Sequence, residues 1–162
     1  MPLTTYQKRR NFAKTSEPAG EQNSASSSQL VFVIQKHQAS HLHYDLRLEI
    51  DGVLKSWAVP KGVSRNPKDK RLAIVTEDHP IAYKDFEGTI PEGEYGAGIV
   101  EIWDRGTYKN LRSLSMAESF ADGKIQIEFK GKKITGDYTL VRIKNFQDTK
   151  KDADMWLIIK NE

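Results

Sequence analysis

The amino-acid sequence predicts a mainly β fold, a compact antiparallel β-barrel of about eight strands with a short flanking helix. Two observations carry this prediction. Short segments in which apolar and polar residues alternate recur along most of the chain, and such alternation is typical of half-buried strands. The two-residue turn signals Asp51-Gly52 and Gly131-Lys132 each separate two such segments, which indicates hairpins. Many short antiparallel strands favour a barrel or a sandwich.

The expected strands follow one another from residue 31 onward. They span residues 31–37, 42–50, 53–59, 72–77, 99–103, 124–130, 133–143 and 155–160. Residues 88–98 are rich in glycine but lack the Gly-Lys-Ser/Thr ending of a phosphate-binding P-loop, so we expect a structural loop there. Residues 110–120 are the one segment whose pattern clearly predicts a helix. The helix is expected to end near Asp122-Gly123, because glycine can adopt the left-handed conformation of a helix terminus.

The chain has 162 residues, the length of about one domain. Residues 1–29 are expected to form a basic, partly flexible N-terminal segment, because residues 21–29 are polar and rich in serine. The compact β-barrel domain is then expected to span residues 30–162. No ligase or polymerase domain fits within this length, so a stand-alone protein is expected.

Composition excludes several classes of protein. The apolar runs are too short to cross a bilayer, there is no cysteine, and the first 20 residues lack the pattern of a secretion signal. We therefore expect a cytoplasmic protein without membrane contact. The net charge of +3 is mild. Basic clusters such as residues 8–10 and 61–71 would suit a phosphate backbone, although ordinary solvated faces explain them equally well.

Three of the four histidines lie between residues 37 and 43. In the strand 42–50, the odd positions are polar and the even positions are apolar or aromatic, so His43 and Asp45 share one face. If the preceding strand pairs with it through a short turn, His37 lies opposite His43 with Cβ atoms about 5 Å apart. Imidazole and carboxylate groups are ligands of divalent metals. The pattern therefore predicts a metal site made of His37, His43 and Asp45, with the Arg47 guanidinium nearby to bind a phosphate.

The polar residues of this region also fit plainer roles. The odd positions of the strand are also compatible with an ordinary solvent-exposed face, although the crowding of metal-ligand residue types favours the metal site. His41 is expected to lie in the turn, exposed to solvent. His79 precedes Pro80 and is expected at a strand end, where it would either contact a phosphate or be a plain surface residue. Residues 49–52 resemble the Lys-x-Asp-Gly motif of nucleotidyl-transferring ligases. Glu49 replaces its lysine, so ligase activity is not expected.

Several segments closely resemble the 3'-phosphoesterase domain of bacterial DNA ligase D. They are residues 32–37, 43–49, 51–62, 76–80 and 86–96, together with residues 8–12, 15–18 and 155–159. The resemblance implies a compact β-barrel with a manganese-dependent site, although other divalent metals are possible. It implies an enzyme that removes a 3'-terminal ribonucleoside and then the 3'-phosphate, leaving a 3'-hydroxyl for non-homologous end joining. The implied partners are DNA 3' ends, including primer-template ends, a separate DNA ligase and a Ku-type protein.

Position by position, the resemblance places metal ligands at His37, His43 and Asp45. It assigns phosphate contact and catalysis to Arg47 and His79. Supporting positions in the active site are Gln35, Lys61, Glu77 and Tyr83, and N-terminal residues that join the site are Arg10 and Glu17. Asn11 departs from the family motif, in which we expect aspartate, and this departure bears on the ribonucleoside-removing step.

Two other functions fit some of the same residues. His43 and Asp45 match the His-x-Asp part of the triad of non-haem iron oxygenases, in which His79 would be the third ligand and His37 would have no role. A non-catalytic module that recognises DNA ends and keeps a structural metal is the other alternative.

Overall fold

A computed structural model describes residues 3–19, 29–143 and 154–162. Most of the serine-rich segment expected to be flexible lies outside these residues. The strands are β1 (Leu30–Gln38), β2 (Leu42–Ile50), β3 (Val53–Val59), β4 (Lys70–His79), β5 (Gly88–Ile90), β6 (Gly98–Asn110), β7 (Lys124–Lys130), β8 (Thr135–Arg142) and β9 (Met155–Lys160). The helices are α1 (Thr4–Lys8), the 3-10 helix η1 (Ile81–Asp85) and α2 (Met116–Asp122).

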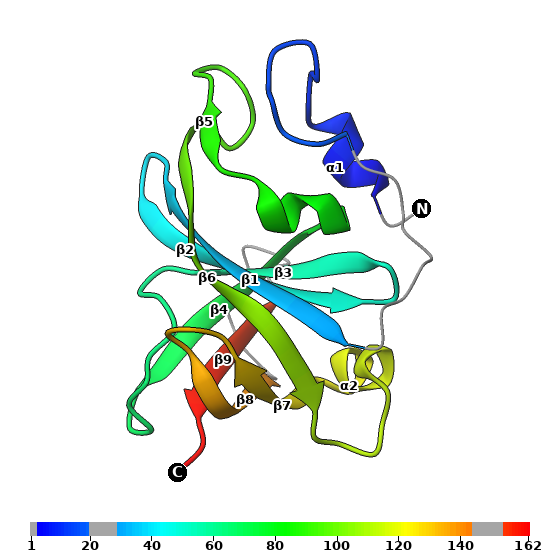
Figure 1. The fold of residues 1–162 in the computed structure, drawn as a ribbon, viewed down its shortest axis with the longest axis vertical. Coiled ribbons are helices and arrows are strands. Elements are labelled where there is room, and N and C mark those ends of the chain that lie inside the picture. Colours follow the sequence, from blue (N-terminus) through cyan, green and yellow to red (C-terminus); the bar gives the residue numbers. More distant parts are fainter. Residues whose placement is uncertain (1–2, 20–28, 144–153) are drawn as a thin grey trace.

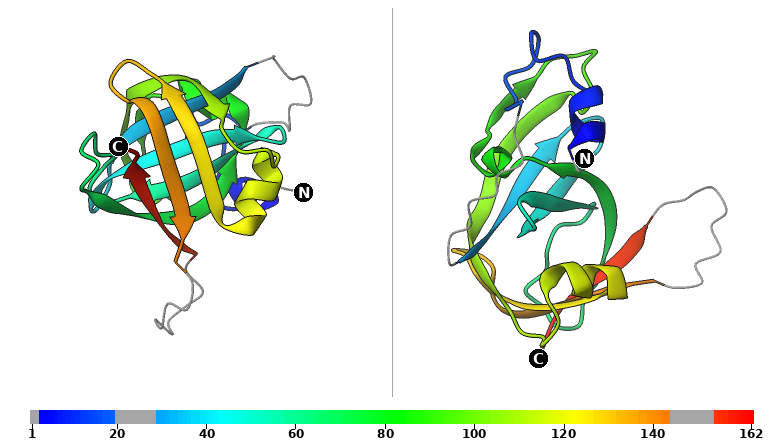
Figure 2. Two further views of the ribbon diagram at one scale, coloured as in Figure 1. Left: turned by 90° about the horizontal axis from the view of Figure 1, so that it is seen from below. Right: turned by 90° about the vertical axis from the view of Figure 1, so that its right-hand side faces the viewer.

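The strands close into an antiparallel barrel. They pair in the order β1-β2-β3-β4-β9-β8-β7-β6, and β6 pairs with β1 to complete the ring of eight strands. The short strand β5 pairs with the beginning of β6 and adds a ninth strand to the same sheet. Figure 2 shows the strands curving around a common interior. The barrel predicted from the sequence is confirmed.

Alternation along the strands places apolar residues in the barrel interior. On β2 these are the even-numbered Leu46, Leu48 and Ile50, all at most 2% exposed. Trp57 and Trp156 are fully buried in the interior with their ring centroids 5.6 Å apart, and Phe120 of α2 packs on both. The even face of β2 therefore belongs to the interior, and its odd face points out of the barrel.

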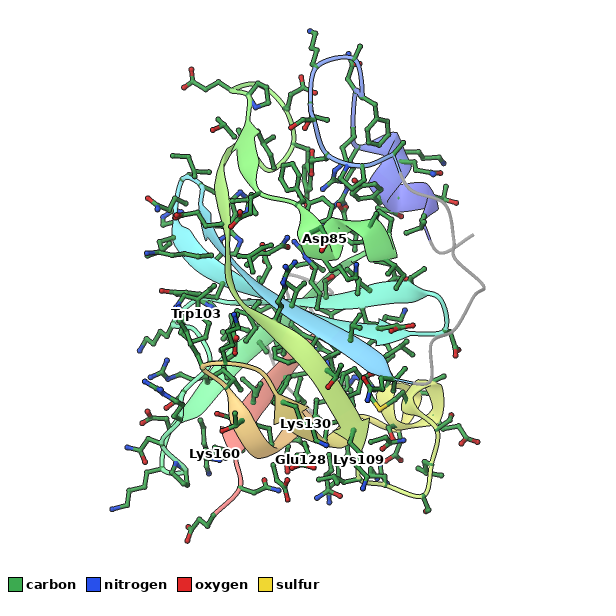
Figure 3. All side chains as sticks on the ribbon, viewed as in Figure 1. Asp85, Trp103, Lys109, Glu128, Lys130 and Lys160 are labelled. Carbon is green, nitrogen blue, oxygen red and sulfur yellow. The ribbon has the colours of Figure 1, made fainter. Side chains whose placement is uncertain are left out.

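A second layer covers part of that outer face. Figure 1 shows α1, η1 and β5 gathered at one end of the molecule, beside β1, β2 and β3. Their side chains form a smaller core of Tyr6, Leu54, Tyr83, Phe86, Ile90 and Val100. Figure 3 shows Lys109, Glu128, Lys130 and Lys160 on the β6–β9 side, away from this layer. The odd residues of β1 and β2 thus lie between two packed layers.

Turn chemistry explains one hairpin that was predicted correctly. Ile50 and Val53 are register partners, so Asp51 and Gly52 form a two-residue connection. Their φ angles are 51° and 83°, and positive values at both central residues characterise the type I′ turn that fits the twist of a hairpin.

The second predicted hairpin is wrong in length. Lys130 pairs with Thr135, so four residues rather than Gly131-Lys132 alone connect β7 and β8. The buried carboxylate of Asp104 on β6 accepts hydrogen bonds from the backbone N–H groups of Lys132, Lys133 and Ile134. The carboxylate thus supplies the hydrogen-bond acceptors that these backbone N–H groups need. Because Asp104 lies far from the loop in sequence, no local turn signal could predict the length of the loop.

The helix predicted over residues 110–120 begins later, and the strand predicted over 99–103 is longer. β6 continues to Asn110, which pairs with Ile127 of β7. The Asn110 side chain stabilises the loop that follows: its amide group donates a hydrogen bond to Leu114 O, and its carbonyl oxygen accepts one from Arg112 N. Ser115 forms a capping box with Glu118, so α2 starts at Met116. The expected end is confirmed, because Gly123 has the left-handed conformation.

Within the described residues, no helix is long and apolar enough to cross a membrane.

Candidate active site

A cavity of about 260 Å³ opens between the outward-facing side of β1 to β4 and the second layer. The sequence-predicted residues in its wall are Arg10, His37, His43, Asp45, Arg47, Glu77, His79 and Tyr83. Asp45 and Arg47 are only 6% and 4% exposed. The interpretation of this strand face as solvent-exposed is therefore wrong, because residues distant in sequence cover it.

His37, His43 and Asp45 form a compact donor cluster. His37 and His43 are register partners on β1 and β2, as the spacing predicted. One donor atom from each of the three residues lies within 4.8 Å of the others. Asp45 Oδ2 lies 3.5 Å from His37 Nδ1, and Asp45 Oδ1 lies 3.2 Å from His43 Nε2. Two imidazole nitrogens and one carboxylate thus face one another.

The remaining imidazole nitrogens are held by backbone carbonyls. His37 Nε2 lies 2.8 Å from Gly96 O, and His43 Nδ1 lies 3.1 Å from His41 O. When each imidazole N–H donates to its backbone carbonyl, the nitrogen that faces Asp45 is the one that can coordinate a metal ion once it has lost its proton. An outer hydrogen bond that fixes the tautomer in this way is characteristic of metal-binding histidines. His41 itself is exposed, as expected, and contributes only its carbonyl.

Charge balance keeps Asp45 ionised. Burial opposes the charge, but Arg47 and the hydrogen bonds with His37 and His43 outweigh it and hold the pKa of Asp45 well below its usual range. The hydrogen bond with Asp45 in turn raises the pKa of His43, against an opposing effect of burial. A metal ion bound here would displace a proton from His43 at mildly acidic pH, because only neutral imidazole is a ligand.

Arg47 connects the donor cluster with His79. Its guanidinium donates to Gln35 Oε1 at 2.7 Å and to Ser56 Oγ at 2.9 Å, and it lies 3.4 Å from Asp45 Oδ2. Arg47 Nη1 also lies 3.2 Å from His79 Nδ1. Gln35 is oriented by donating its amide to the carbonyls of Tyr83 and Phe86. The guanidinium is therefore rigidly positioned at the cavity wall.

His79 lies at the end of β4, as expected from Pro80, but it is buried rather than on the surface. It is 5% exposed and packs against the rings of Tyr6 and Tyr83. Burial, with Arg47 and Arg10 adding to it, holds the pKa of His79 well below its ordinary value. The imidazole is consequently neutral at neutral pH in the free protein.

The N-terminal residues close the cavity with a buried charge network. Arg10 donates to Glu17 Oε2 at 3.0 Å and to Glu77 Oε2 at 2.5 Å. The Tyr83 hydroxyl donates to the same Glu17 oxygen at 2.6 Å. Burial opposes the charge of Arg10, but Glu77 and Glu17 outweigh it and raise its pKa. Residues from the first 17 positions therefore lie against the same cavity as β1 to β4.

The model of the family described as DNA Ligase D 3'-phosphoesterase domain matches residues 35–142. The chain belongs to this family. Membership confirms the resemblance found in the sequence. The matched region includes the donor cluster, Arg47, His79 and Tyr83.

Similarity to multifunctional LigD proteins extends over nearly the whole chain. It is 44% identical over 160 residues to the non-homologous end joining protein LigD of Pseudomonas aeruginosa, covering 98% of this chain and 18% of that protein. It is 44% identical over 166 residues to LigD of Mycobacterium tuberculosis, covering 99% and 20%. It is 45% identical over 146 residues to LigD of Mycolicibacterium smegmatis, covering 88% and 19%. The chain spans about a fifth of the length of these relatives.

Lys61, a predicted supporting residue, and Asn11, the departure from the family motif, lie on the surface of the protein and not in the cavity wall. Lys61 is exposed just after β3, and its backbone carbonyl accepts a hydrogen bond from Arg71. Asn11 is also exposed, and its side chain accepts a hydrogen bond from Ala13 N within the N-terminal loop.

Ser56, Tyr95 and Gly96 belong to the site but were missed in the sequence. Ser56 is the register partner of Arg47, and parity along residues 53–59 would have placed it on the same face. Tyr95 and Gly96 lie in the glycine-rich stretch that was interpreted as a structural loop. The feature of the sequence that could have indicated them is an aromatic residue among glycines, because glycine allows the backbone to approach a side chain such as His37 closely.

The low pKa of His79 predicts a pH-dependent stability of the metal-free protein. The unfolded chain binds a proton at this residue near pH 6.5, whereas the folded protein resists protonation. The contribution of neutral His79 is therefore complete above pH 6.5 and is lost as the pH falls. Relative to His79→Asn, which preserves a polar atom near Nδ1, the wild type should lose about 1.4 kcal/mol of unfolding free energy between pH 7.5 and 5.5.

Urea denaturation of both proteins in a chelator at several pH values measures this difference. Because His43 titrates in both proteins, its opposite contribution cancels in the comparison. Parallel curves of unfolding free energy against pH would show that His79 titrates normally in the folded state.

Proposed function

We propose that the chain is a divalent-metal-dependent phosphoesterase that repairs DNA 3' ends. It removes a 3'-terminal ribonucleoside and then the remaining 3'-phosphate, leaving a 3'-hydroxyl. The observation that carries this proposal is the donor cluster, in which both imidazoles are oriented toward Asp45 beside the buried guanidinium of Arg47.

The donor set fits a resident metal ion. His37, His43 and Asp45 would hold it, and both imidazoles already have the outer hydrogen bonds that ligating histidines require. When bound, a divalent cation would polarise a phosphate oxygen as a Lewis acid. The family resemblance favours Mn²⁺, and the two-nitrogen, one-carboxylate set admits other divalent ions as well.

Arg47 and His79 would bind the other oxygens of the phosphate. Arg47 is prepositioned by Gln35 and Ser56, so its donors would not need to reorganise as charge develops. His79 is neutral in the free protein, but the negative charge of a bound phosphate favours its protonation. It would then supply a proton to the leaving oxygen. With no serine or cysteine assigned as a nucleophile, we favour direct attack by water.

Tyr83, Glu77, Arg10 and Glu17 would shape the wall that faces the substrate. Burial raises the pKa of Tyr83 against the opposing effect of Arg47, so its hydroxyl remains a hydrogen-bond donor to Glu17. Glu77 and Glu17 in turn orient Arg10. Lys61 would contact the DNA outside the cavity, because its side chain is exposed just after β3.

The decisive experiment is incubation of a labelled primer-template that ends in one ribonucleotide, with and without Mn²⁺. We expect a product shorter by one nucleoside with a terminal phosphate, followed by its conversion to a 3'-hydroxyl end. Chelation should stop both steps. Binding without turnover in Mn²⁺ would instead support a DNA-end-binding module.

An iron oxygenase is the less favoured alternative. In the described residues the third donor beside His43 and Asp45 is His37, whereas His79 lies against Arg47 and outside the cluster. Oxygen consumption with iron and an oxoacid, without phosphate release, would support the oxygenase.

The partners follow from the proposed product. A 3'-hydroxyl end is the substrate of a DNA ligase, and the names of the relatives refer to non-homologous end joining. We therefore propose that a separate ligase and a Ku-type end-binding protein act with this chain. Co-purification on DNA ends tests both.

A further inference from the structure

A second cavity of about 440 Å³ adjoins the active-site cavity. Tyr95, Thr76 and Glu77 contribute to the walls of both. The volume lies within the range of about 300–1,000 Å³ that small-molecule sites span. The second cavity therefore lies directly beside the first, close enough to take a part of the substrate that is attached to a phosphate in the first.

Tyr95 gives the junction of the two cavities an aromatic surface. It lies between β5 and β6 and is 48% exposed. The Arg9 guanidinium lies 4.7 Å from the centroid of its ring, and that of Arg10 lies 5.3 Å away. Arg9 Nη1 also donates to the Tyr95 hydroxyl at 2.8 Å. Aromatic rings combined with arginine planes are surfaces on which unpaired nucleobases stack.

The positive charge on this surface is paired with a carboxylate of the protein, which suits an uncharged ligand. Arg9 Nη1 pairs with Glu77 Oε1 at 2.9 Å, so its positive charge is already balanced. Because its charge is paired with the buried Glu77 carboxylate, Arg9 adds little attraction for a second phosphate. Thr5, Thr76 and Asp78 in the wall offer hydrogen-bonding groups for sugar hydroxyls. A nucleoside, with its flat base and polar ribose, matches these features.

We propose that Tyr95 and Arg9 form the subsite for the nucleoside that is removed from the DNA 3' end. This inference rests on the proposed function and assigns the specificity for its first step. The base stacks on Tyr95 while the scissile phosphate lies beside Arg47. A 3'-phosphate end has no nucleoside at this position, so the subsite favours ribonucleoside removal and contributes little to phosphate removal.

The same loop also supports a proposed metal ligand. Gly96, next to Tyr95, accepts the hydrogen bond from His37 Nε2. A substitution that disturbed the loop would therefore weaken the metal site and reduce both activities together. Loss of base stacking alone would reduce ribonucleoside removal selectively, so the ratio of the two activities separates these effects.

The test compares wild type, Tyr95→Phe and Tyr95→Ala with Mn²⁺ on three ends: a terminal ribonucleotide, a 3'-phosphate, and a stable abasic analogue that keeps the ribose 2'-hydroxyl. In Tyr95→Ala, the ratio of kcat/KM for ribonucleoside removal to that for phosphate removal should fall about 10-fold or more, the scale of one base stack on an aromatic ring. Tyr95→Phe should keep the wild-type ratio within a few fold.

Base removal provides the second measurement. In the wild type, the abasic end should react about 10-fold or more slowly than the ribonucleotide end, whereas Tyr95→Ala should hardly distinguish them, because the two changes remove one interaction. Equal losses on ribonucleotide and phosphate ends, or independent effects of base removal and Tyr95→Ala, would overturn the subsite. A wild type that releases no phosphate in Mn²⁺ would instead overturn the proposed function.

Discussion

Asp45→Asn is expected to abolish Mn²⁺-dependent release of phosphate from a DNA 3' end. The substitution keeps the size of the side chain but removes the negative charge that faces His37 and His43. Removing a direct ligand should weaken Mn²⁺ binding by more than the roughly 10- to 100-fold that loss of an outer hydrogen-bond partner costs. Calorimetric titration with Mn²⁺ and a phosphate-release assay measure the two effects.

His41→Ala is the matched control for this experiment. His41 lies within the same histidine-rich stretch, but its side chain is exposed and only its backbone carbonyl contacts His43. The control should therefore bind Mn²⁺ and release phosphate like the wild type. Wild-type Mn²⁺ affinity and activity in Asp45→Asn would rule out the proposed donor cluster.

Local sequence patterns predicted those parts of the fold that are determined by residues close together in the sequence. Strand alternation and the Asp51-Gly52 turn depend on neighbouring residues, and they gave eight barrel strands and one hairpin correctly. The three-residue strand β5 was missed because it is defined by its pairing with β6 rather than by its own pattern. The length of the β7–β8 loop depends on Asp104, which contacts that loop in space but lies far from it in sequence.

The same division applies to the candidate site. Parity and cross-strand pairing brought His37, His43 and Asp45 together before any fold was known, because a tight β1–β2 connection fixes the register. Periodicity could not show that this polar face is buried, since its cover comes from α1 and η1. The resemblance to the family was needed to identify His79, whose burial depends on Tyr6 and Tyr83.

The covering layer explains why so polar a face is stable. Buried charges are tolerated when each is paired and hydrogen-bonded. Arg47 faces Asp45, and Arg10 faces Glu17 and Glu77, so positive and negative groups alternate across the cavity wall. This arrangement leaves a preorganised set of donors where a phosphate would bind. The proposed chemistry and the stability of the second layer thus depend on the same pairs.

Arg47→Lys should separate phosphate binding from metal binding. Lysine keeps a positive charge beside Asp45, but its single ammonium cannot reproduce the planar fork that contacts Gln35 and Ser56. We expect kcat for 3'-phosphate release to fall about 10²- to 10³-fold, the usual cost of losing one preorganised donor to the developing charge. Mn²⁺ affinity should remain near the wild-type value, because all three proposed ligands are unchanged.

Ser56→Ala serves as the control for packing around Arg47. It removes a hydroxyl that accepts from Arg47 Nη1, yet Ser56 lies outside the cavity wall and Nη1 still faces His79. We expect a loss of about 1.5–3 kcal/mol of unfolding free energy, the range for a hydrogen bond to a charged group, and a smaller fall in kcat than in Arg47→Lys, because Gln35 still holds the guanidinium. If Arg47→Lys lost only stability and kept its kcat, the guanidinium would be a structural counter-ion of Asp45. A loss of kcat at unchanged Mn²⁺ affinity assigns it to the phosphate, since the metal ligands and the net charge are the same in both proteins.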